Sequence, residues 1–429
     1  MTPEIKHRIG QIRRGEMPEG YNRVRDSIIP SDWKQYCLGE LGKNKNGLNF
    51  HREDKGIKIR ILGVRDFGNL SVLRDLNALS EISMRFMPDD ELLLKNGDIV
   101  FVRSNGSKEL VGRNLLVYPQ NEKVSFSGFC IRFRLSSDKI TTAEYINLLL
   151  DNGVLKQKLQ SENQGSNISN LNQSIIDNLQ ISIPCKGEQQ KIVAILTTQD
   201  RVIELKEKRL AGKQRQKKYL MQQLLTGKKR LPGFSEEWKK VKIGSFIKEI
   251  DERSTVNNQY EILSVTKNGM VFQSSHFNKQ IASENNVGYK VVRRGNLAFS
   301  TMNLWMGSLD TLRICDTGIV SPAYKVFEFN QSLIVVNFAE NYMKSAEMIW
   351  LYKANSEQGA SIVRRNLDLQ ALLNSEVALP DISEQTAIAE VLSAADHEID
   401  LLRQDIEQEK QKKKALMQLL LTGIVRVKT

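Results

Sequence analysis

The chain contains the segment Leu220-Met221-Gln222-Gln223-Leu224-Leu225-Thr226-Gly227. It repeats this segment 196 positions later as Leu416-Met417-Gln418-Leu419-Leu420-Leu421-Thr422-Gly423. The match extends without a gap from residues 184–230 to residues 380–426, and 18 of the 47 aligned residues are identical. An internal repeat has to be identified first, because each copy is one structural unit. The chain is therefore organised around a duplicated segment.

Each copy predicts one long helix. Pro184 and Pro380 precede the two copies, and Gly227 and Gly423 follow the last apolar pair, where a left-handed helix cap is expected. Residues 188–226 contain no proline and would form a rod of about 57 Å at 1.5 Å per residue. Gly212 inside the first copy is only a mild cost.

Residues recur every seven positions in both copies, which is typical of a coiled coil. The seam positions are Leu196, Ile203, Leu210, Lys217 and Leu224 in the first copy and Leu392, Ile399, Ile406, Lys413 and Leu420 in the second. We assign Leu220 and Leu416 to the same interface.

The two copies differ in charge. Residues 200–230 hold 11 basic and 3 acidic residues, whereas residues 396–429 hold 7 and 6. The simplest partner of the basic helix is therefore the more acidic helix of the same chain. The alternative, two unrelated solvated helices, would leave both leucine seams exposed.

The bulk composition describes a globular protein with two or three domains. Its 429 residues are 40% hydrophobic and 26% charged, and no apolar run has the roughly 20 residues of a membrane helix. The polar N-terminus indicates no secretory signal. The four cysteines are far apart, which favours reduced thiols and a cytoplasmic location. The net charge of +12 favours a polyanionic partner, nucleic acid first.

Two lobes, residues 31–184 and 235–380, lie between the copies. They share an order of landmarks: a tryptophan near the start (Trp33, Trp238), then a glycine turn that leads into a strand (Gly97, Gly295). Short β-rich segments with frequent turn residues predict a mostly-β lobe with some helices. We expect helices at 143–161 and 341–355, strands at 124–135 and 319–329, and amphipathic turns at 174–179 and 369–373.

The N-terminal segment resembles the exit from the first helix. Residues 12–21 place Gly15 and then Pro-Glu-Gly-Tyr after a helical end, and residues 225–234 place Gly227 and then Pro-Gly-Phe after Leu225. Each lobe is thus entered and left through equivalent sequence. We therefore expect residues 1–30 to pack near the C-terminal helix in a pseudo-two-fold arrangement.

These features resemble the specificity subunits of type I restriction-modification systems. The resemblance is carried by the run from Leu220 to Phe234, by its echo at 416–423 and by the Pro-x-x-x-Glu-Gln start of each helix. It implies an α+β fold. Two mostly-β target-recognition domains (31–184 and 235–380) would be separated by a central helix (185–234) and a C-terminal helix (381–429). These helices would form an intramolecular antiparallel coiled coil. The second copy lacks the Leu-Pro-Gly-Phe exit, as expected if no third lobe follows.

The resemblance also implies a function in host defence. Each lobe would read a short half-site of double-stranded DNA, and the target would be bipartite and asymmetric. Two modification subunits would methylate adenine N6 with S-adenosylmethionine. Restriction subunits, which are translocase-nucleases, would add ATP- and Mg-dependent cleavage. We expect no cofactor or metal on this chain itself.

The sequence supports no catalytic role for this chain. It has no Gly-x-x-x-x-Gly-Lys-[Ser/Thr] loop and no Asn-Pro-Pro-aromatic run, and Pro88-Asp89 is not followed by acidic-x-Lys. His51 and His276 lack an evident triad or ligand set. The alternatives are an enzyme without recognisable motifs and a coiled-coil interaction protein that binds no DNA.

Base reading requires Arg, Lys, Asn, Gln or Ser side chains on loops that reach base edges. The candidates in lobe one are Arg60, Arg65, Arg103, Ser104, Asn105, Lys108 and Arg113. The candidates in lobe two are Thr301, Asn303 and Trp305. Each polar candidate is a base contact, a phosphate contact or a solvated loop residue. Trp305 either stacks on a base or belongs to the core.

Overall fold

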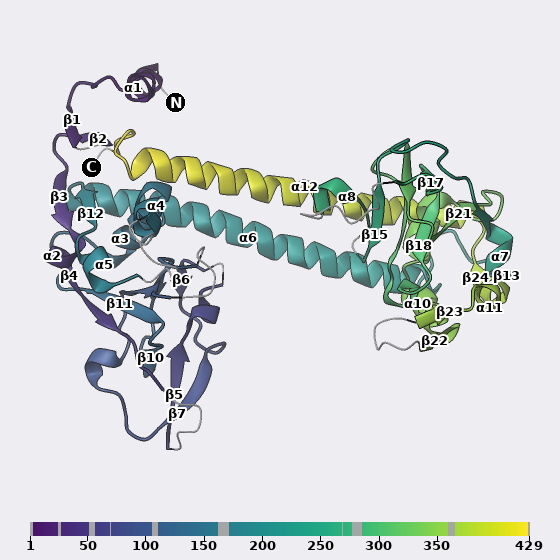
Figure 1. Cartoon of the computed structure of the whole chain (residues 1–429), viewed down its shortest axis with the longest axis horizontal. Coiled ribbons are helices and arrows are strands. Elements are labelled where there is room, and N and C mark those ends of the chain that lie inside the picture. Colours follow the sequence, from purple (N-terminus) through teal and green to yellow (C-terminus); the bar gives the residue numbers. More distant parts are fainter. Residues whose placement is uncertain are drawn as a thin grey trace. The chain divides into compact units, whose positions relative to one another are not determined.

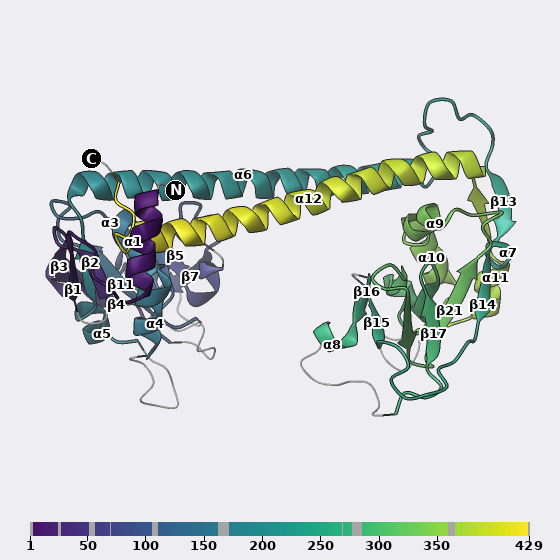
Figure 2. The same ribbon diagram turned by 90° about the horizontal axis from the view of Figure 1, so that it is seen from above.

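A computed structural model describes residues 3–24, 27–50, 56–68, 70–104, 110–161, 171–267, 269–276, 285–358 and 365–427. The chain divides into two compact units (Figures 1 and 2): Met1–Leu205 with Ile406–Thr429, and Lys206–Asp405. The division falls within both long helices. Each unit therefore holds one lobe together with one part of each helix.

The duplicated segment forms two helices of 39 residues each, α6 (Lys186–Leu224) and α12 (Ile382–Leu420) (Figure 1). Both begin two residues after the proline of the repeat. The predicted left-handed caps are confirmed, because φ is 65° at Gly227 and 72° at Gly423. In the first cap, the Lys229 amide reaches back to the Gln223 carbonyl at 3.1 Å.

Unit one contains a five-stranded sheet in the order β4-β11-β8-β9-β6 and a three-stranded sheet in the order β10-β5-β7. Two-stranded ladders join β1 to β2 and β3 to β12. Its strands are β1 (Tyr21–Val24), β2 (Ser27–Pro30), β3 (Lys34–Cys37), β4 (Gly42–Asn46), β5 (Ile57–Leu62), β6 (Val72–Leu73), β7 (Ser80–Met84), β8 (Asp98–Val102), β9 (Asn114–Val117), β10 (Val124–Phe126), β11 (Cys130–Leu135) and β12 (Gln180–Ile183). Its shorter helices are α1 (Pro3–Arg13), α2 (Leu38–Leu41), η1 (Val64–Phe67), η2 (Asp90–Leu92), α3 (Ala143–Leu150), α4 (Gly153–Ser161) and α5 (Gln173–Asp177).

Unit two contains a four-stranded sheet in the order β14-β21-β18-β19, with two-stranded ladders β13-β24, β15-β16, β17-β20 and β22-β23. Its strands are β13 (Lys239–Lys242), β14 (Ile247–Ile250), β15 (Leu263–Thr266), β16 (Gly269–Phe272), β17 (Lys290–Arg293), β18 (Leu297–Ser300), β19 (Leu309–Thr311), β20 (Thr317–Val320), β21 (Tyr324–Phe329), β22 (Ser356–Gln358), β23 (Arg365–Leu367) and β24 (Glu376–Leu379). Its shorter helices are α7 (Ile243–Phe246), α8 (Gln273–His276), η3 (Leu304–Met306), α9 (Val336–Tyr342), α10 (Ala346–Ala354) and α11 (Leu369–Asn374).

The two lobes share one topology. The first strand of each lobe pairs antiparallel with its last strand, β3 with β12 and β13 with β24, immediately before a long helix begins. The sheet order β4-β11-β8-β9 of lobe one is repeated in lobe two as β14-β21-β18-β19. The α+β fold class with two similar mostly-β lobes and two long helices is therefore confirmed.

Four expected elements were too long. The predicted helix at 143–161 is two helices, α3 and α4, because Asp151 caps the end of α3. The predicted helix at 341–355 likewise gives way to α9 and α10, since the Ser345 side chain accepts from the Met348 amide and starts a new helix. The strand expected at 124–135 turns at residues 127–129 and becomes β10 and β11, which lie in different sheets. The strand expected at 319–329 turns at residues 321–323 and is divided in the same way between β20 and β21.

The leucines of the repeated segment are buried in the lobe cores. Leu420 and Leu421 are 4% exposed and pack into the core of lobe one. Leu224 and Leu225 pack into the core of lobe two. Apolar burial of this extent stabilises by about 1.5–3 kcal/mol per side chain. The repeated segment is thus a hydrophobic anchor for a lobe as well as a helix end.

Within each unit, α6 and α12 run antiparallel. In unit one Lys413 Nζ lies 2.5 Å from Asp200 Oδ1, and in unit two Lys217 Nζ lies 2.5 Å from Asp396 Oδ1. These ion pairs are equivalent under the duplication and occupy the two polar seam positions. The buried seam residues are Leu196, Ile203, Leu224, Leu392, Ile399, Ile406 and Leu420, whereas Leu210, Leu220 and Leu416 are partly buried.

The N-terminal segment contacts the end of α12 in unit one. The Tyr21 hydroxyl donates to the Gly423 carbonyl at 2.7 Å, and Arg8 donates to the Ile424 carbonyl at 3.3 Å. A side chain at Gly423 would overlap Pro30, since an added Cβ would lie 2.5 Å from its Cγ. Glycine at this position thus allows the left-handed cap and the close approach together.

Candidate nucleic-acid interface and helix junctions

A buried glutamate ties the start of each long helix to the chain that leaves the other helix. In unit one Arg426 donates to Glu188 from Nε at 2.9 Å and from Nη2 at 2.8 Å, and also to Asp32. In unit two Arg230 donates to Glu384 from Nε at 2.5 Å and from Nη2 at 2.6 Å. Both glutamate side chains are 1% exposed. We call these two contacts the helix junctions.

The glutamine that follows each glutamate joins the same helix to its own lobe. Gln189 donates from Nε2 to the carbonyls of Pro184 and Ile140, both at 2.9 Å. Gln385 donates to the carbonyls of Pro380 and Leu333, also at 2.9 Å. The proline, glutamate and glutamine of the Pro-x-x-x-Glu-Gln start therefore each take part in a contact that holds the beginning of the helix.

The junctions differ in their tryptophans. In unit two the Trp238 indole donates to Glu384 at 3.1 Å. In unit one the buried Trp33 indole N–H has no partner among the described residues. Arg426 instead reaches the additional carboxylate of Asp32, and this interaction lowers the pKa of Asp32.

Several candidates of lobe one meet where β8 ends. The amides of Arg103 and Ser104 both approach the carbonyl of Phe129, at 2.8 and 3.4 Å. The Arg113 carbonyl accepts from the Val102 amide at 2.9 Å, which places Arg113 on the neighbouring chain. The side chains of Arg103, Ser104 and Arg113 are partly exposed. The three residues, which the sequence placed in one candidate loop, therefore lie close together in the structure.

The remaining candidates of lobe one are dispersed. Arg65 is exposed in η1, just beyond Leu62, whose carbonyl accepts from the Ser127 amide at 2.9 Å. Arg60 lies within β5, opposite Val124, and forms an ion pair with Glu122. Asn105 and Lys108 lie outside the described residues, as does His51.

The candidates of lobe two follow the equivalent strand, β18. Thr301 and Asn303 are partly exposed in the turn after Ser300. Trp305 lies in η3, partly buried, with the Arg365 guanidinium 5.8 Å from its ring centroid. Trp305 was expected either to stack on a base or to belong to the core. The ring is partly buried and is in contact with Arg365, which fits either role.

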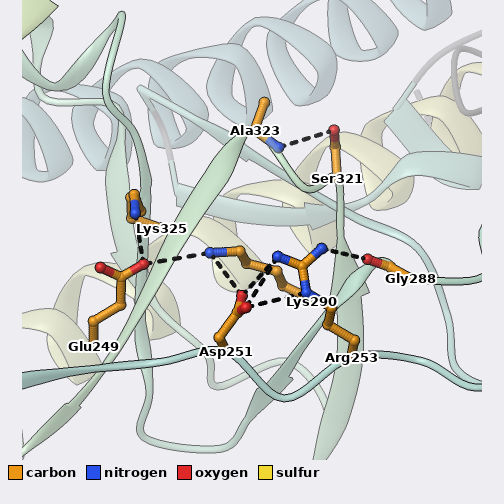
Figure 3. Close-up of polar contacts among 8 residues, drawn as sticks. All are labelled: Glu249, Asp251, Arg253, Gly288, Lys290, Ser321, Ala323 and Lys325. Atoms are coloured by element: carbon orange, nitrogen blue, oxygen red, sulfur yellow. Dashed lines mark hydrogen bonds and ion pairs between the residues drawn. The ribbon is translucent and has the colours of Figure 1, made fainter.

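Lobe two contains a charged network around Lys290 that was not among the predicted site residues (Figure 3). The Lys290 side chain is only 5% exposed, and its Nζ lies 3.4 Å from Glu249 Oε1 and 3.2 Å from Asp251 Oδ1. Glu249 also binds Lys325 at 2.7 Å, and Asp251 binds Arg253. Arg253 and then Lys290 lower the pKa of Asp251. Three cations therefore share two carboxylates, which leaves one net positive charge.

No local pattern signals this network, because Glu249 and Lys290 are 41 positions apart. They meet because β14 pairs with β21, which carries Lys325, and because β17 begins at Lys290.

The lobe-one counterpart of β21 is β11. Arg134 on β11 binds the buried Asp98 at 2.8 Å.

One carboxyl next to the helix pair has a perturbed pKa. Burial raises the pKa of Asp151 from 3.8 to about 6, although Lys413 and Lys156 favour its ionised form. Asp151 is the residue that caps α3, and its side chain is hydrogen-bonded to Asn114. The Asn114 amide in turn donates to the Asn147 side chain at 2.9 Å. This carboxyl responds to pH in a range where an ordinary aspartate does not.

Among the described residues, His, Cys, Asp and Glu side chains form no group of three that could hold a metal ion. Cys37, Cys130, Cys185 and Cys315 are all unpaired thiols, and burial raises the pKa of Cys130 to about 12. Within the same residues, no helix has the length and apolarity needed to span a membrane.

Comparison with known proteins gives a consistent result. The sequence matches the family described as "Type I restriction modification DNA specificity domain" over residues 30–212 and 235–411. The chain is similar to two proteins of Methanocaldococcus jannaschii. One, the putative type I restriction enzyme MjaX specificity subunit, is 24% identical over 96% of this chain and 98% of its own length. The other, the type I restriction enzyme MjaVIII specificity subunit, is 23% identical over 96% and 97%.

A solved structure is similar as well. It is described as "Structural basis underlying complex assembly and conformational transition of the type I R-M system". It superposes with a TM-score of 0.58 at 16% identity, covering 92% of this chain and 99% of that chain. At this level of identity the likeness is one of fold.

Proposed function

The chain belongs to the type I restriction-modification DNA specificity family, and we propose that it directs its complex to a bipartite, asymmetric DNA target. It is the specificity subunit and not a catalytic one. In this proposal, each lobe reads one half-site. The lobe boundaries are 31–184 and 235–380, with the helical segments 185–234 and 381–429 and the N-terminal segment 1–30 as scaffold.

One observation carries this proposal. The two helix junctions have nearly the same arginine–glutamate contact, whereas the two lobes present different polar side chains at equivalent strand ends. The Arg426–Glu188 and Arg230–Glu384 contacts repeat each other closely. The ends of β8 and β18, which are equivalent in topology, carry different polar side chains. Two different readers on equivalent scaffolds support a target whose two halves differ.

The chemistry of the lobe ends supports DNA as the ligand. Arginine reads guanine through paired hydrogen bonds, and Asn, Ser and Thr contact base edges or phosphates. Arg103 and Ser104 of lobe one, and Thr301 and Asn303 of lobe two, are partly exposed on turns that follow buried strands. The net charge of +12 adds a favourable interaction with phosphates at any sequence.

The partners follow from the same reasoning. Because the junction occurs twice in nearly the same form, it offers two equivalent places for two copies of one partner. We assign these to two modification subunits that methylate adenine N6 with S-adenosylmethionine. Restriction subunits would supply the ATP- and Mg-dependent nuclease. The names of the relatives and the restriction-modification complex of the similar structure support this assignment. Such a complex would act in the cytoplasm.

The test is to sequence the methylated bases of cells that express this chain together with its modification subunit. We expect methyl-adenine in one motif made of two different half-sites and an unread spacer. A hybrid chain, with residues 235–380 taken from another family member, should change one half-site only. No new methylation beyond that of the modification subunit expressed alone, or a palindromic motif, would contradict the proposal.

A further inference from the structure

An exposed phenylalanine next to the candidate reading residues of lobe one is not explained by the fold. Phe129 is 62% exposed, although the residues on either side of its turn, Phe126 and Cys130, are fully buried. A single exposed aromatic residue is not unusual. Phe129 differs because the backbone that carries it is held from two sides.

One side of the turn is held by the chain that follows β4. Gly128 donates to the Leu48 carbonyl at 2.6 Å, and Gly47 donates to the Cys130 carbonyl at 3.1 Å. A Cβ at Gly47 would lie 2.2 Å from the Ser127 carbonyl oxygen. The turn therefore cannot move away from this chain without breaking its hydrogen bonds.

The other side is held by the end of β8. The amides of Arg103 and Ser104 approach the Phe129 carbonyl, and the Ser127 hydroxyl accepts from the Phe129 amide at 3.3 Å. Arg103 and Ser104 are also candidates for base reading. The backbone that carries the Phe129 ring is thus hydrogen-bonded to the backbone of an arginine and a serine.

Lobe two contains the same turn with a different residue at its tip (Figure 3). The Ser321 hydroxyl accepts from the Ala323 amide at 3.5 Å, and Tyr324 donates to the Ser321 carbonyl at 3.0 Å. In lobe one the corresponding Cys130 to Ser127 contact measures 2.8 Å. The shared backbone indicates that the turn belongs to the scaffold, whereas the tip, phenylalanine or alanine, is free to differ between readers.

We propose that the Phe129 ring inserts against a base step of the lobe-one half-site and partly unstacks it. Apolar side chains inserted between base steps kink and unstack duplex DNA, and stacking on a base is tolerant of its identity. A ring already held in place pays little ordering entropy on binding. This inference rests on the proposed function, because it names a contact made by the lobe-one reader.

The experiment uses the purified complex of this chain with its modification subunits and a duplex that carries the methylated motif. 2-Aminopurine, placed at successive positions of each half-site, reports unstacking by its rise in fluorescence. We expect Phe129→Ala to weaken binding about five- to 150-fold, the range for loss of one base–aromatic stack. The fluorescence rise should disappear in the lobe-one half-site only. Phe129→Trp should keep both the affinity and the fluorescence rise, because tryptophan can stack on a base in the same way.

Phe86→Ala is the matched control. Phe86 is 81% exposed in the same lobe but follows β7, near the Ile57 end of β5, whereas the Phe129 turn adjoins Leu62 at the other end. Removal of the Phe86 ring should leave the affinity and the fluorescence signal unchanged. An equal effect of both changes would overturn the proposal, because it would indicate a general loss of apolar surface.

Three further results would overturn it. Phe129→Ala could bind with unchanged affinity while the wild-type complex still recognises its two-part target. It could also fail to assemble with the modification subunits, which would make the ring a protein contact. A lower melting temperature for Phe129→Ala would make the ring a folding element. Failure of the wild-type complex to recognise any two-part target would instead contradict the proposed function.

Discussion

Arg426 binds the carboxylate of Glu188 through two hydrogen bonds, from Nε to Oε1 at 2.9 Å and from Nη2 to Oε2 at 2.8 Å. The two residues are 238 positions apart in the sequence. One lies in the first turn of α6 and the other just beyond the end of α12. The contact therefore closes unit one by joining the start of one long helix to the end of the other.

Arg426→Ala should destabilise unit one by about 1–3 kcal/mol, because it leaves the buried Glu188 carboxylate without its charged donor. The guanidinium is one-third exposed, so solvent screens part of the interaction. Urea denaturation of the full chain measures the loss. Arg426→Lys should lose less, since it keeps the charge but not the paired geometry. Unchanged stability of Arg426→Ala would show that the junction is not structural.

In the charged network of lobe two, Glu249→Gln should cost about 1–3 kcal/mol, because Glu249 is the shared partner of Lys290 and Lys325. Lys290→Met should cost less than about 1.5 kcal/mol, since methionine keeps the buried volume and removes the buried charge. The double variant should regain part of the Glu249→Gln loss. Strictly additive free energies of unfolding in this cycle would contradict coupling.

Asp151→Asn should stabilise the chain at neutral pH but not at pH 4. The folded-state pKa of about 6 lies above the ordinary value of 3.8, so the folded chain binds this proton more tightly. The stabilising effect of the protonated Asp151 carboxyl is fully present below pH 4 and is lost as pH rises through 6. The variant should therefore gain about 1–3 kcal/mol over the wild type at pH 7.5. A difference in unfolding free energy that stays constant from pH 4 to 8 would refute this assignment.

Arg103→Ala should weaken binding of the complex to its target by about 1–3 kcal/mol and relax the preference at one base position. The reason is that Arg103 follows a buried strand and lies beside Ser104 on a braced turn. Binding to single-base variants of the target measures the preference. If binding instead falls equally for all sequences and the salt slope drops by about one, Arg103 contacts a phosphate.

Insertion of one heptad into both α6 and α12, next to the Lys206–Asp405 ion pair, should lengthen the unread spacer. Seven residues add about 10.5 Å of helix, which is about three base pairs at 3.4 Å each. The heptad period keeps the seam in register. Methylome sequencing should show both half-sites unchanged. An altered half-site would mean that the helices take part in base reading.

The duplicated helices could be read from the sequence because their signals are local. Proline before the helix, a seven-residue period and glycine after the last leucines each act within a few residues of the backbone they control. The left-handed conformation of Gly227 and Gly423 followed from that pattern alone. The lobes also share an order of landmarks in the sequence, and the strand order β4-β11-β8-β9 of lobe one is repeated in lobe two as β14-β21-β18-β19.

Element lengths inside the lobes were less predictable. We expected one helix at residues 143–161, yet α3 ends at its cap residue Asp151 and is buried in the lobe core, and a second helix follows. Apolar content does not locate such a break, because apolar residues occur on both sides of it, at 148–150 and again at Leu155 and Leu159.

Other features depended on the tertiary structure because their partners are distant in the chain. Local pattern marks Glu188 and Arg426 only as parts of a repeat, and folding brings them within hydrogen-bonding distance. The Lys290 network and the raised pKa of Asp151 arise in the same way, from burial and charges contributed by other elements. Arg103 stood out in the sequence as a polar residue after a strand. Phe129 did not, because an apolar residue in a strand is expected to be buried, and only the turn that carries it leaves its ring exposed.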